Sequence, residues 1–161
     1  MRATSYLENG PDAQLRVTPT KKLSPEIVCL LDDDALVLRS TRLLLTSAGF
    51  VVLQFDKGED FIAYVSSRHV PLVVLDIWME EMTGFEVMAR LCAISPRTHV
   101  IVVTGHEDTV ARTLAMQIGT VDFLTKPFDD EQFLEAVHRA LGHSYSKKKR
   151  AVRRARTLYT D

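Results

Sequence analysis

The sequence predicts a single α/β domain in which a parallel five-stranded sheet carries helices on both faces. Short apolar runs recur along the chain, segments with helical periodicity lie between them, and the runs are apolar throughout rather than alternating. Continuous apolarity is typical of strands buried on both faces of a parallel sheet. Strands that alternate with helices over ~115 residues favour right-handed crossovers within one sheet.

The five apolar runs are predicted as strands, and each is expected to be buried on both faces because apolar residues occupy both sides of the run. Turn or cap residues bound every run. In chain order the predicted strands are Ile27–Leu31, Val51–Phe55, Leu72–Leu75, Val100–Val103 and Val121–Leu124.

Helices are predicted between and after these runs from apolar residues at steps of three and four. Gly49 and Gly119 provide C-terminal stops, and Asp129 or Asp130 can cap the last helix. The predicted helices are Ala35–Ala48, Gly58–Ser67, Phe85–Ala93, Thr109–Ile118 and a final helix that runs to Leu141.

Extensions are predicted on both sides of this domain. Residues 1–25 are polar and lack periodicity, which indicates a flexible N-terminal extension before a domain at 26–142. Residues 143–161 are expected to form a basic linker or helical tail, with a thin apolar stripe at Ala151, Ala155 and Leu158.

Charge is distributed unevenly, although the formal net charge of the 161 residues is only −1. Lys147–Asp161 holds seven basic residues and one acidic residue, which leaves −7 for residues 1–146. An acidic body is not typical of a nucleic-acid-binding fold. Any DNA affinity is therefore expected to come from the tail or from a missing neighbouring domain.

Cysteine content and hydropathy indicate a soluble, cytoplasmic protein. Cys29 and Cys92 are expected to be buried free thiols rather than a disulfide pair. The N-terminus lacks the apolar core of a signal peptide, and no stretch approaches the roughly 18–20 apolar residues that span a bilayer. No membrane contact is expected.

Polar side chains follow four of the predicted strands. Asp32–Asp34 follow the first strand, Asp76 the third, Thr104 the fourth and Lys126 the fifth. Ligands of such sheets bind beyond the carboxyl ends of the strands, so these side chains are expected to meet there. Carboxylates gathered at one edge repel one another unless a cation joins them, and oxygen ligands favour a hard ion such as Mg²⁺.

This set of residues predicts phosphoryl transfer to an aspartate. A carboxylate can attack phosphorus, and the metal and a lysine would neutralise the transferring oxygens while the Thr104 hydroxyl bonds the product. Each residue alone has a plainer interpretation: Asp32–Asp34 could cap a helix, Thr104 could be a turn residue, and Lys126 could be solvated. The prediction of Asp76 as acceptor depends on all four strand ends together.

The combined pattern resembles the receiver domains of bacterial response regulators over roughly Glu26 to Leu141. That family carries an acidic pair, a phospho-acceptor, a Ser or Thr, and a Lys-Pro after strands one, three, four and five. The stretches LDIWMEEMTGFEVM, VVTGHED and VDFLTKPF are similar to the corresponding family segments, and TGHED and DFLTKPF resemble receivers of nitrogen-fixation-type transcriptional regulators. The matching residues are Asp32 with Asp33, Asp76, Thr104, and Lys126 with Pro127.

The resemblance implies a flavodoxin-like fold with strand order 2-1-3-4-5 and assigns the metal ligands. Asp33, Asp76 and the main-chain carbonyl of Trp78 would bind Mg²⁺ directly, and Asp32 would act through water. Lys126 and Thr104 would bind the phosphate. As the switch of the domain, Thr104 would be drawn toward the phosphate and the ring of Phe123 would turn inward.

The resemblance also implies the partners. A sensor histidine kinase would supply the phosphoryl group, and phosphorylation would promote a homodimer that controls transcription. The basic tail would lead to a DNA-binding output domain that is absent from this chain. The domain would not be an enzyme beyond autocatalytic acceptance and slow self-dephosphorylation.

Three residues near the acceptor are expected to modulate the phosphate. Glu80 stands where the family commonly has proline, and its charge is either a solvated loop charge or an influence on phosphoryl lifetime. Trp78 and His106 could screen the phosphate from water. Their plainer alternatives are a hydrophobic loop anchor and a solvated histidine at a helix start.

Two other functions fit parts of the pattern. A Mg²⁺-dependent phosphohydrolase of the haloacid-dehalogenase type would use Asp32 as nucleophile within Asp32-x-Asp34, but it leaves Asp76 without a role and requires a cap insertion that is missing. A receiver-like docking module would bind a partner without accepting phosphate.

Overall fold

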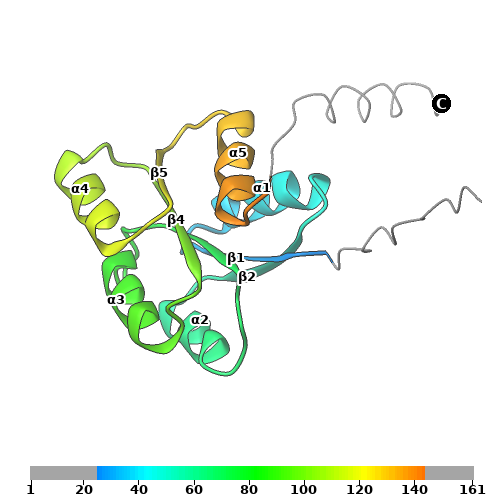
Figure 1. Cartoon of the computed structure of the whole chain (residues 1–161). Helices are drawn as coiled ribbons and strands as arrows, with labels where there is room; N and C mark the ends of the chain where they lie inside the picture. The colour runs from blue at the N-terminus through cyan, green and yellow to red at the C-terminus, as the bar shows by residue number, and fades with distance from the viewer. Residues whose placement is uncertain (1–24, 144–161) are drawn as a thin grey trace, which may run out of the picture.

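A five-stranded parallel sheet forms the centre of the protein in the computed structural model, which describes residues 25–143 (Figure 1). The strand order is β2-β1-β3-β4-β5, and every neighbouring pair is parallel. The strands are β1 (Ile27–Leu31), β2 (Val51–Phe55), β3 (Leu72–Leu75), β4 (His99–Thr104) and β5 (Asp122–Thr125). The helices are α1 (Ala35–Ser47), α2 (Gly58–Val65), α3 (Gly84–Ile94), α4 (Thr109–Ile118) and α5 (Asp130–Ala140). The predicted fold class is confirmed.

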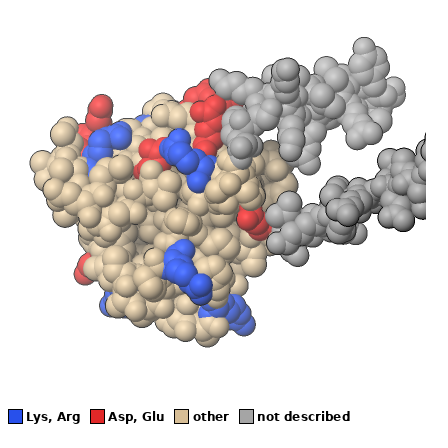
Figure 2. Space-filling model, viewed as in Figure 1, with Lys and Arg blue, Asp and Glu red and all other residues tan. Residues whose placement is uncertain are grey.

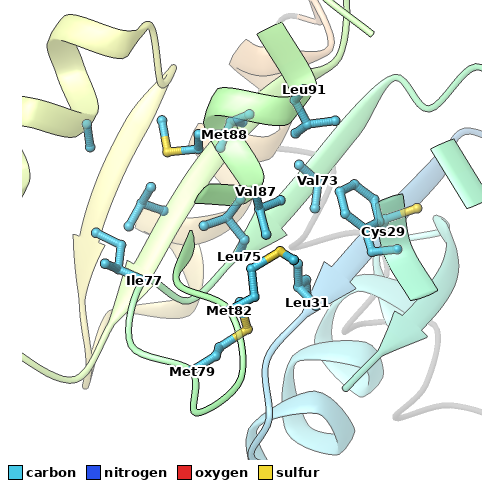
Figure 3. Packing of buried hydrophobic residues seen from close by; sticks show 14 of the residues in the cluster. Cys29, Leu31, Val73, Leu75, Ile77, Met79, Met82, Val87, Met88 and Leu91 are labelled. Atoms are coloured by element: carbon cyan, nitrogen blue, oxygen red, sulfur yellow. The ribbon is translucent and has the colours of Figure 1, made fainter. Parts of the chain in front are cut away.

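Helices cover both faces of the sheet and divide the core into two apolar clusters. The cluster under α1 and α5 includes Leu45 and Phe133, which are fully buried. The cluster under α2, α3 and α4 includes Phe61 and Val87 and extends into the loop after β3 (Figure 3). On the outer surface, the face in Figure 2 shows charged side chains scattered among uncharged ones.

The two edge strands, β2 and β5, differ from their predictions. β2 has a neighbour on one side only, so Val51 and Gln54 are exposed and the expectation that this strand is buried on both faces was wrong. β5 begins one residue later than predicted, at Asp122, although Val121 already donates its amide to the carbonyl of Val100 on β4. The central strands β1 and β3 keep their predicted bounds.

Local capping explains where the helices begin and end. Asp34, Asp108 and Asp129 each accept backbone amides at the start of α1, α4 and α5. Gly49 and Gly119 follow α1 and α4 with positive φ of 99° and 113°, as a glycine stop requires. The stops predicted at Gly49 and Gly119 and the cap predicted before α5 are therefore confirmed, with Asp129 rather than Asp130 as that cap.

The two cysteines lie in different environments. Cys29 is fully buried in β1, and burial raises the pKa of its thiol to about 12. Cys92 is exposed on α3, so the expectation of two buried thiols was wrong for Cys92. Its place on the solvent side of an amphipathic helix accounts for the difference.

No helix within residues 25–143 is long and apolar enough to cross a bilayer. The predicted N-terminal extension and the basic tail fall almost entirely outside the described residues.

Candidate functional site

Backbone pairing brings Asp32 and Asp76 to one edge of the sheet. Leu31 pairs with Leu75 in neighbouring parallel strands, so the next residue of each strand is the aspartate. The Asp76 amide donates to the Leu31 carbonyl at 3.0 Å, which fixes the two strand ends against each other. The meeting of these carboxylates follows from sheet register.

Lys126 reaches from the end of β5 into this edge. Its Nζ lies 2.8 Å from Asp32 Oδ2 and 3.6 Å from Asp76 Oδ2. The lysine side chain is 21% exposed, and the two carboxylate side chains are 9% and 12% exposed, so the group is largely shielded from water. The plainer interpretation of Lys126 as a solvated surface residue is wrong.

Burial dominates the titration of Asp32. Desolvation raises the pKa of this carboxyl above its ordinary value, and the nearby charge of Asp76 acts in the same direction. The Lys126 ammonium and the Asp34 amide, which donate to Asp32 at 2.8 Å and 2.9 Å, offset part of that rise. Asp32 therefore carries its charge at a cost that a further cation would reduce.

Asp33 contacts the loop that follows Asp76. Its Oδ2 accepts the Glu80 amide at 3.0 Å, a contact between residues 47 positions apart. The Trp78 amide donates to Asp76 Oδ1 at 3.1 Å. The loop is thus bonded to both carboxylates through its main chain.

Methionines anchor this loop to the core. Met79 and Met82 are each 8% exposed and turn inward toward Leu31 and Leu75 (Figure 3). Trp78 is 45% exposed, so the alternative that made it the loop anchor is wrong. Apolar burial of the methionines holds the loop while the indole stays at the surface.

Gly84 lies directly behind Asp76, and sequence reasoning missed it. Its amide donates to the Ile77 carbonyl at 2.8 Å. A Cβ at this position would stand 2.5 Å from the Asp76 carbonyl oxygen and 2.8 Å from Ile77 Cα. A detectable signal was the capping box of Thr83 and Glu86, which places a glycine at the first position of α3.

Thr104 and His106 border the acceptor on the β4 side. Thr104 is fully buried, and its Oγ1 accepts the His106 amide at 3.4 Å. The His106 ring lies edge-on to Trp78 with ring centroids 6.5 Å apart. His106 is exposed in the loop two residues before the Asp108 cap, in agreement with a solvated histidine at the helix start.

Phe123 and Glu80 differ in their exposure to solvent. Phe123 is only 2% exposed and belongs to the core beneath α4. Glu80 is exposed, in agreement with a solvated loop charge.

The carboxylates supply oxygen atoms that suit a hard cation. Between residues 25 and 143, however, no three acidic, histidine or cysteine side chains already converge as a metal site. The Lys126 ammonium lies between Asp32 and Asp76, and Asp33 is bonded to the Glu80 amide. The chemistry of the donors fits Mg²⁺, and the bond to the Glu80 amide occupies only one of the acceptor positions of the Asp33 carboxylate.

Asp34 does not share in this site. Its Oδ1 accepts the amides of Leu36 and Val37 at the start of α1, at 2.8 Å and 3.3 Å. The carboxylate that a haloacid-dehalogenase mechanism would use as acid and base is thus engaged as a helix cap.

Comparison with known proteins identifies the family. The model of the response regulator receiver domain matches residues 28–138. FixJ, a transcriptional regulatory protein of Rhizobium meliloti, is 35% identical over 116 residues, which cover 72% of this chain and 57% of that protein. The response regulator TodT of Pseudomonas putida is 32% identical over 127 residues, covering 79% of this chain and 56% of TodT. The chain thus spans just over half the length of these relatives.

Solved structures agree with the sequence comparison. The crystal structure of FixJ-N is 33% identical, with a TM-score of 0.70, and the match covers 77% of this chain and 99% of that chain. The beryllofluoride-activated NtrC4 receiver domain dimer is 28% identical, with a TM-score of 0.69 and coverage of 72% and 96%. The family match also rules out the haloacid-dehalogenase alternative. The chain belongs to the response regulator receiver domain family, the phosphorelay signalling modules found in transcriptional regulators such as FixJ and in response regulators such as TodT.

Proposed function

We propose that Asp76 accepts a phosphoryl group from a sensor histidine kinase in a Mg²⁺-dependent reaction. The observation that carries the proposal is the placement of Lys126 Nζ, 2.8 Å from Asp32 and 3.6 Å from Asp76 at one shielded sheet edge. A fixed ammonium beside a carboxylate nucleophile is the arrangement that stabilises charge on a transferring phosphoryl group.

The metal ligands would be Asp33, Asp76 and the main-chain carbonyl of Trp78, with Asp32 acting through water. When bound, Mg²⁺ neutralises charge on the phosphoryl oxygens and draws the carboxylates together. The Glu80 amide already holds Asp33 beside the loop that carries Trp78. Asp32 keeps Lys126 directed at the acceptor through its hydrogen bond to Nζ.

Transfer would proceed by attack of an Asp76 carboxylate oxygen on phosphorus as the phosphorus–nitrogen bond of the kinase phosphohistidine breaks. The leaving imidazole takes up a proton, and Lys126 pairs with the phosphate that now sits on Asp76. The buried Thr104 hydroxyl would rotate from the His106 amide to a phosphate oxygen. Phe123, on the strand paired with β4, would complete the switch.

Trp78, Glu80 and His106 would set the lifetime of the phosphate. Trp78 and His106 follow the ends of neighbouring strands and their rings approach edge to face, so together they would limit access of water to the acceptor. The exposed Glu80 side chain adds negative charge to the loop. Both effects bear on hydrolysis rather than on acceptance.

The output of the whole protein belongs to the same proposal. Similarity to FixJ and TodT supports transcriptional control through a DNA-binding region that would follow the basic residues 143–161. The beryllofluoride-activated NtrC4 receiver is a dimer, which supports phosphorylation-dependent self-association here. The boundaries proposed for the receiver remain residues 26–142.

Intact-protein mass spectrometry after incubation with acetyl phosphate and Mg²⁺ tests the proposal. We expect one added phosphoryl group in the wild type, none in Asp76→Asn, and normal labelling in Asp56→Asn, whose carboxylate follows β2 at the same sheet edge. Labelling that survives Asp76→Asn would disprove the acceptor assignment. An unlabelled wild type that still binds a kinase would favour the docking module.

A further inference from the structure

Arg112 on α4 lies over the ring of Phe123 on β5. The guanidinium carbon is 4.7 Å from the ring centroid, within the range of a cation–π contact. The ring is only 2% exposed, whereas Arg112 is exposed and makes no ion pair with any residue of the described range 25–143. The guanidinium therefore covers the outward face of a ring that is otherwise in the core.

The remaining contacts of α4 with the core are small along most of the helix, and only the partly buried Ile118 at its end adds a large apolar side chain. Its fully buried side chains are those of Ala111 and Ala115, whereas α5 buries Phe133, Leu134 and Val137 as well as two alanines. Two methyl groups remove little apolar area from water. The Arg112 contact is thus a large part of what holds the start of α4 on the sheet.

β5 provides a fixed base for this contact. Arg139 of α5 forms an ion pair with Asp122, the first residue of β5. Phe123 pairs with Val102, and two residues further along Thr104 pairs with Thr125. The contact between Arg112 and Phe123 therefore ties α4 to the same strand pair that carries Thr104.

The loop between Thr104 and α4 is short. It runs from Gly105 to the Asp108 cap, and Arg112 follows one helical turn after that cap, with its amide bonded to the Asp108 carbonyl at 2.9 Å. Holding Arg112 over the ring limits the movement of this loop at its far end. The position of the Thr104 hydroxyl depends on the same loop through His106.

We infer that Arg112 is a positioning residue of the phospho-acceptor site. Its guanidinium holds Phe123 in the buried position and α4 against β5, which keeps Thr104 placed for a phosphate on Asp76. The inference rests on the proposed function, because it concerns how that site is held rather than a separate activity. Loss of the cation favours arrangements in which Phe123 and the loop are displaced, so phosphate affinity falls.

Titration of the full chain with beryllium fluoride in saturating Mg²⁺ tests the inference, with fluorescence of Trp78, the single tryptophan, as the signal. We expect Arg112→Gln to raise the apparent Kd for beryllium fluoride about two- to fivefold, the strength of a cation–π contact at an exposed site. Arg112→Lys keeps a cation, so its apparent Kd for beryllium fluoride should fall between those of the wild type and Arg112→Gln. The Kd for Mg²⁺ should not change, because Arg112 contacts none of the carboxylates.

A double-mutant cycle separates a contact with the ring from a general effect of charge. In a Phe123→Leu background, Arg112→Gln should have no further effect, since the aromatic face is gone. Arg39→Gln, which removes an exposed arginine from α1, is the matched control and should behave as the wild type. An unchanged Kd in Arg112→Gln, or the same fold-change in the Phe123→Leu background, would overturn the inference. Failure of the wild type to respond, with no labelling of Asp76, would instead overturn the proposed function.

Discussion

Replacing Gly84 by alanine tests how closely α3 approaches the acceptor strand. The new Cβ would stand 2.5 Å from the Asp76 carbonyl oxygen, 2.6 Å from Leu75 Cδ1 and 2.8 Å from Ile77 Cα. Two of these atoms are backbone, so relief requires α3 or the Asp76 strand end to move.

The expected loss of unfolding free energy is about 1–3 kcal/mol, the usual cost of overpacking a filled core. The better helix propensity of alanine offsets at most about 1 kcal/mol of that loss. At about 4 °C for each kcal/mol, the melting temperature should fall by several degrees. Where the Asp76 strand end takes up part of this movement, the acceptor carboxylate is displaced, and phosphorylation by acetyl phosphate should slow by at least about tenfold.

Gly58→Ala provides the matched control. Gly58 is also buried and also opens a helix, but its nearest obstacle is Met82 Sδ at 2.8 Å, the far end of a flexible side chain. Urea unfolding followed by circular dichroism should show a change within about 1 kcal/mol for this variant, and its labelling rate should be nearly normal. A Gly84→Ala protein as stable and as readily labelled as Gly58→Ala would refute the close approach.

Three further predictions concern the carboxylates and the loop. Burial raises the pKa of Asp32, so the stability contributed by this group is complete below its unfolded pKa and is lost as pH rises through the folded pKa. In urea titrations, Asp32→Asn should therefore gain stability relative to the wild type between pH 4 and pH 7. A stability difference that does not depend on pH would contradict the raised pKa. Magnesium at about ten times its Kd should stabilise the wild type by about 1.4 kcal/mol, and calorimetry should show this gain lost in Asp33→Asn. Glu80→Gln should change the dephosphorylation half-life measured by mass spectrometry, whereas Glu81→Gln, in the same loop, should leave it unaltered.

Local sequence patterns correctly predicted the central strands and several helix ends of this protein. The central strands, the glycine stops after α1 and α4 and the Asp129 cap follow from interactions among neighbouring residues, which the sequence displays directly. The edge position of β2 was missed because continuous apolarity does not reveal strand order. Cys92 was likewise misjudged, since a single residue at the margin of an apolar face has no local marker of exposure.

For the candidate site, too, some features follow from local sequence and others only from the tertiary structure. The sequence by itself placed Asp32, Asp76, Thr104 and Lys126 at strand ends, because parallel strands present their carboxyl ends at one edge. Only the tertiary structure decided that Lys126 bridges two carboxylates from 94 and 50 positions away. These contacts join chain segments that closure of the sheet brings together, so no local pattern encodes their distances.

The same reason applies to the two residues that the structure added. Gly84 matters because α3 packs against the backbone of Asp76, and Arg112 matters because α4 crosses β5 beside Phe123. In the sequence one is a glycine after a cap and the other an arginine on a polar helix face. Propensity and periodicity determine which elements form, whereas the packing of those elements determines which side chains meet.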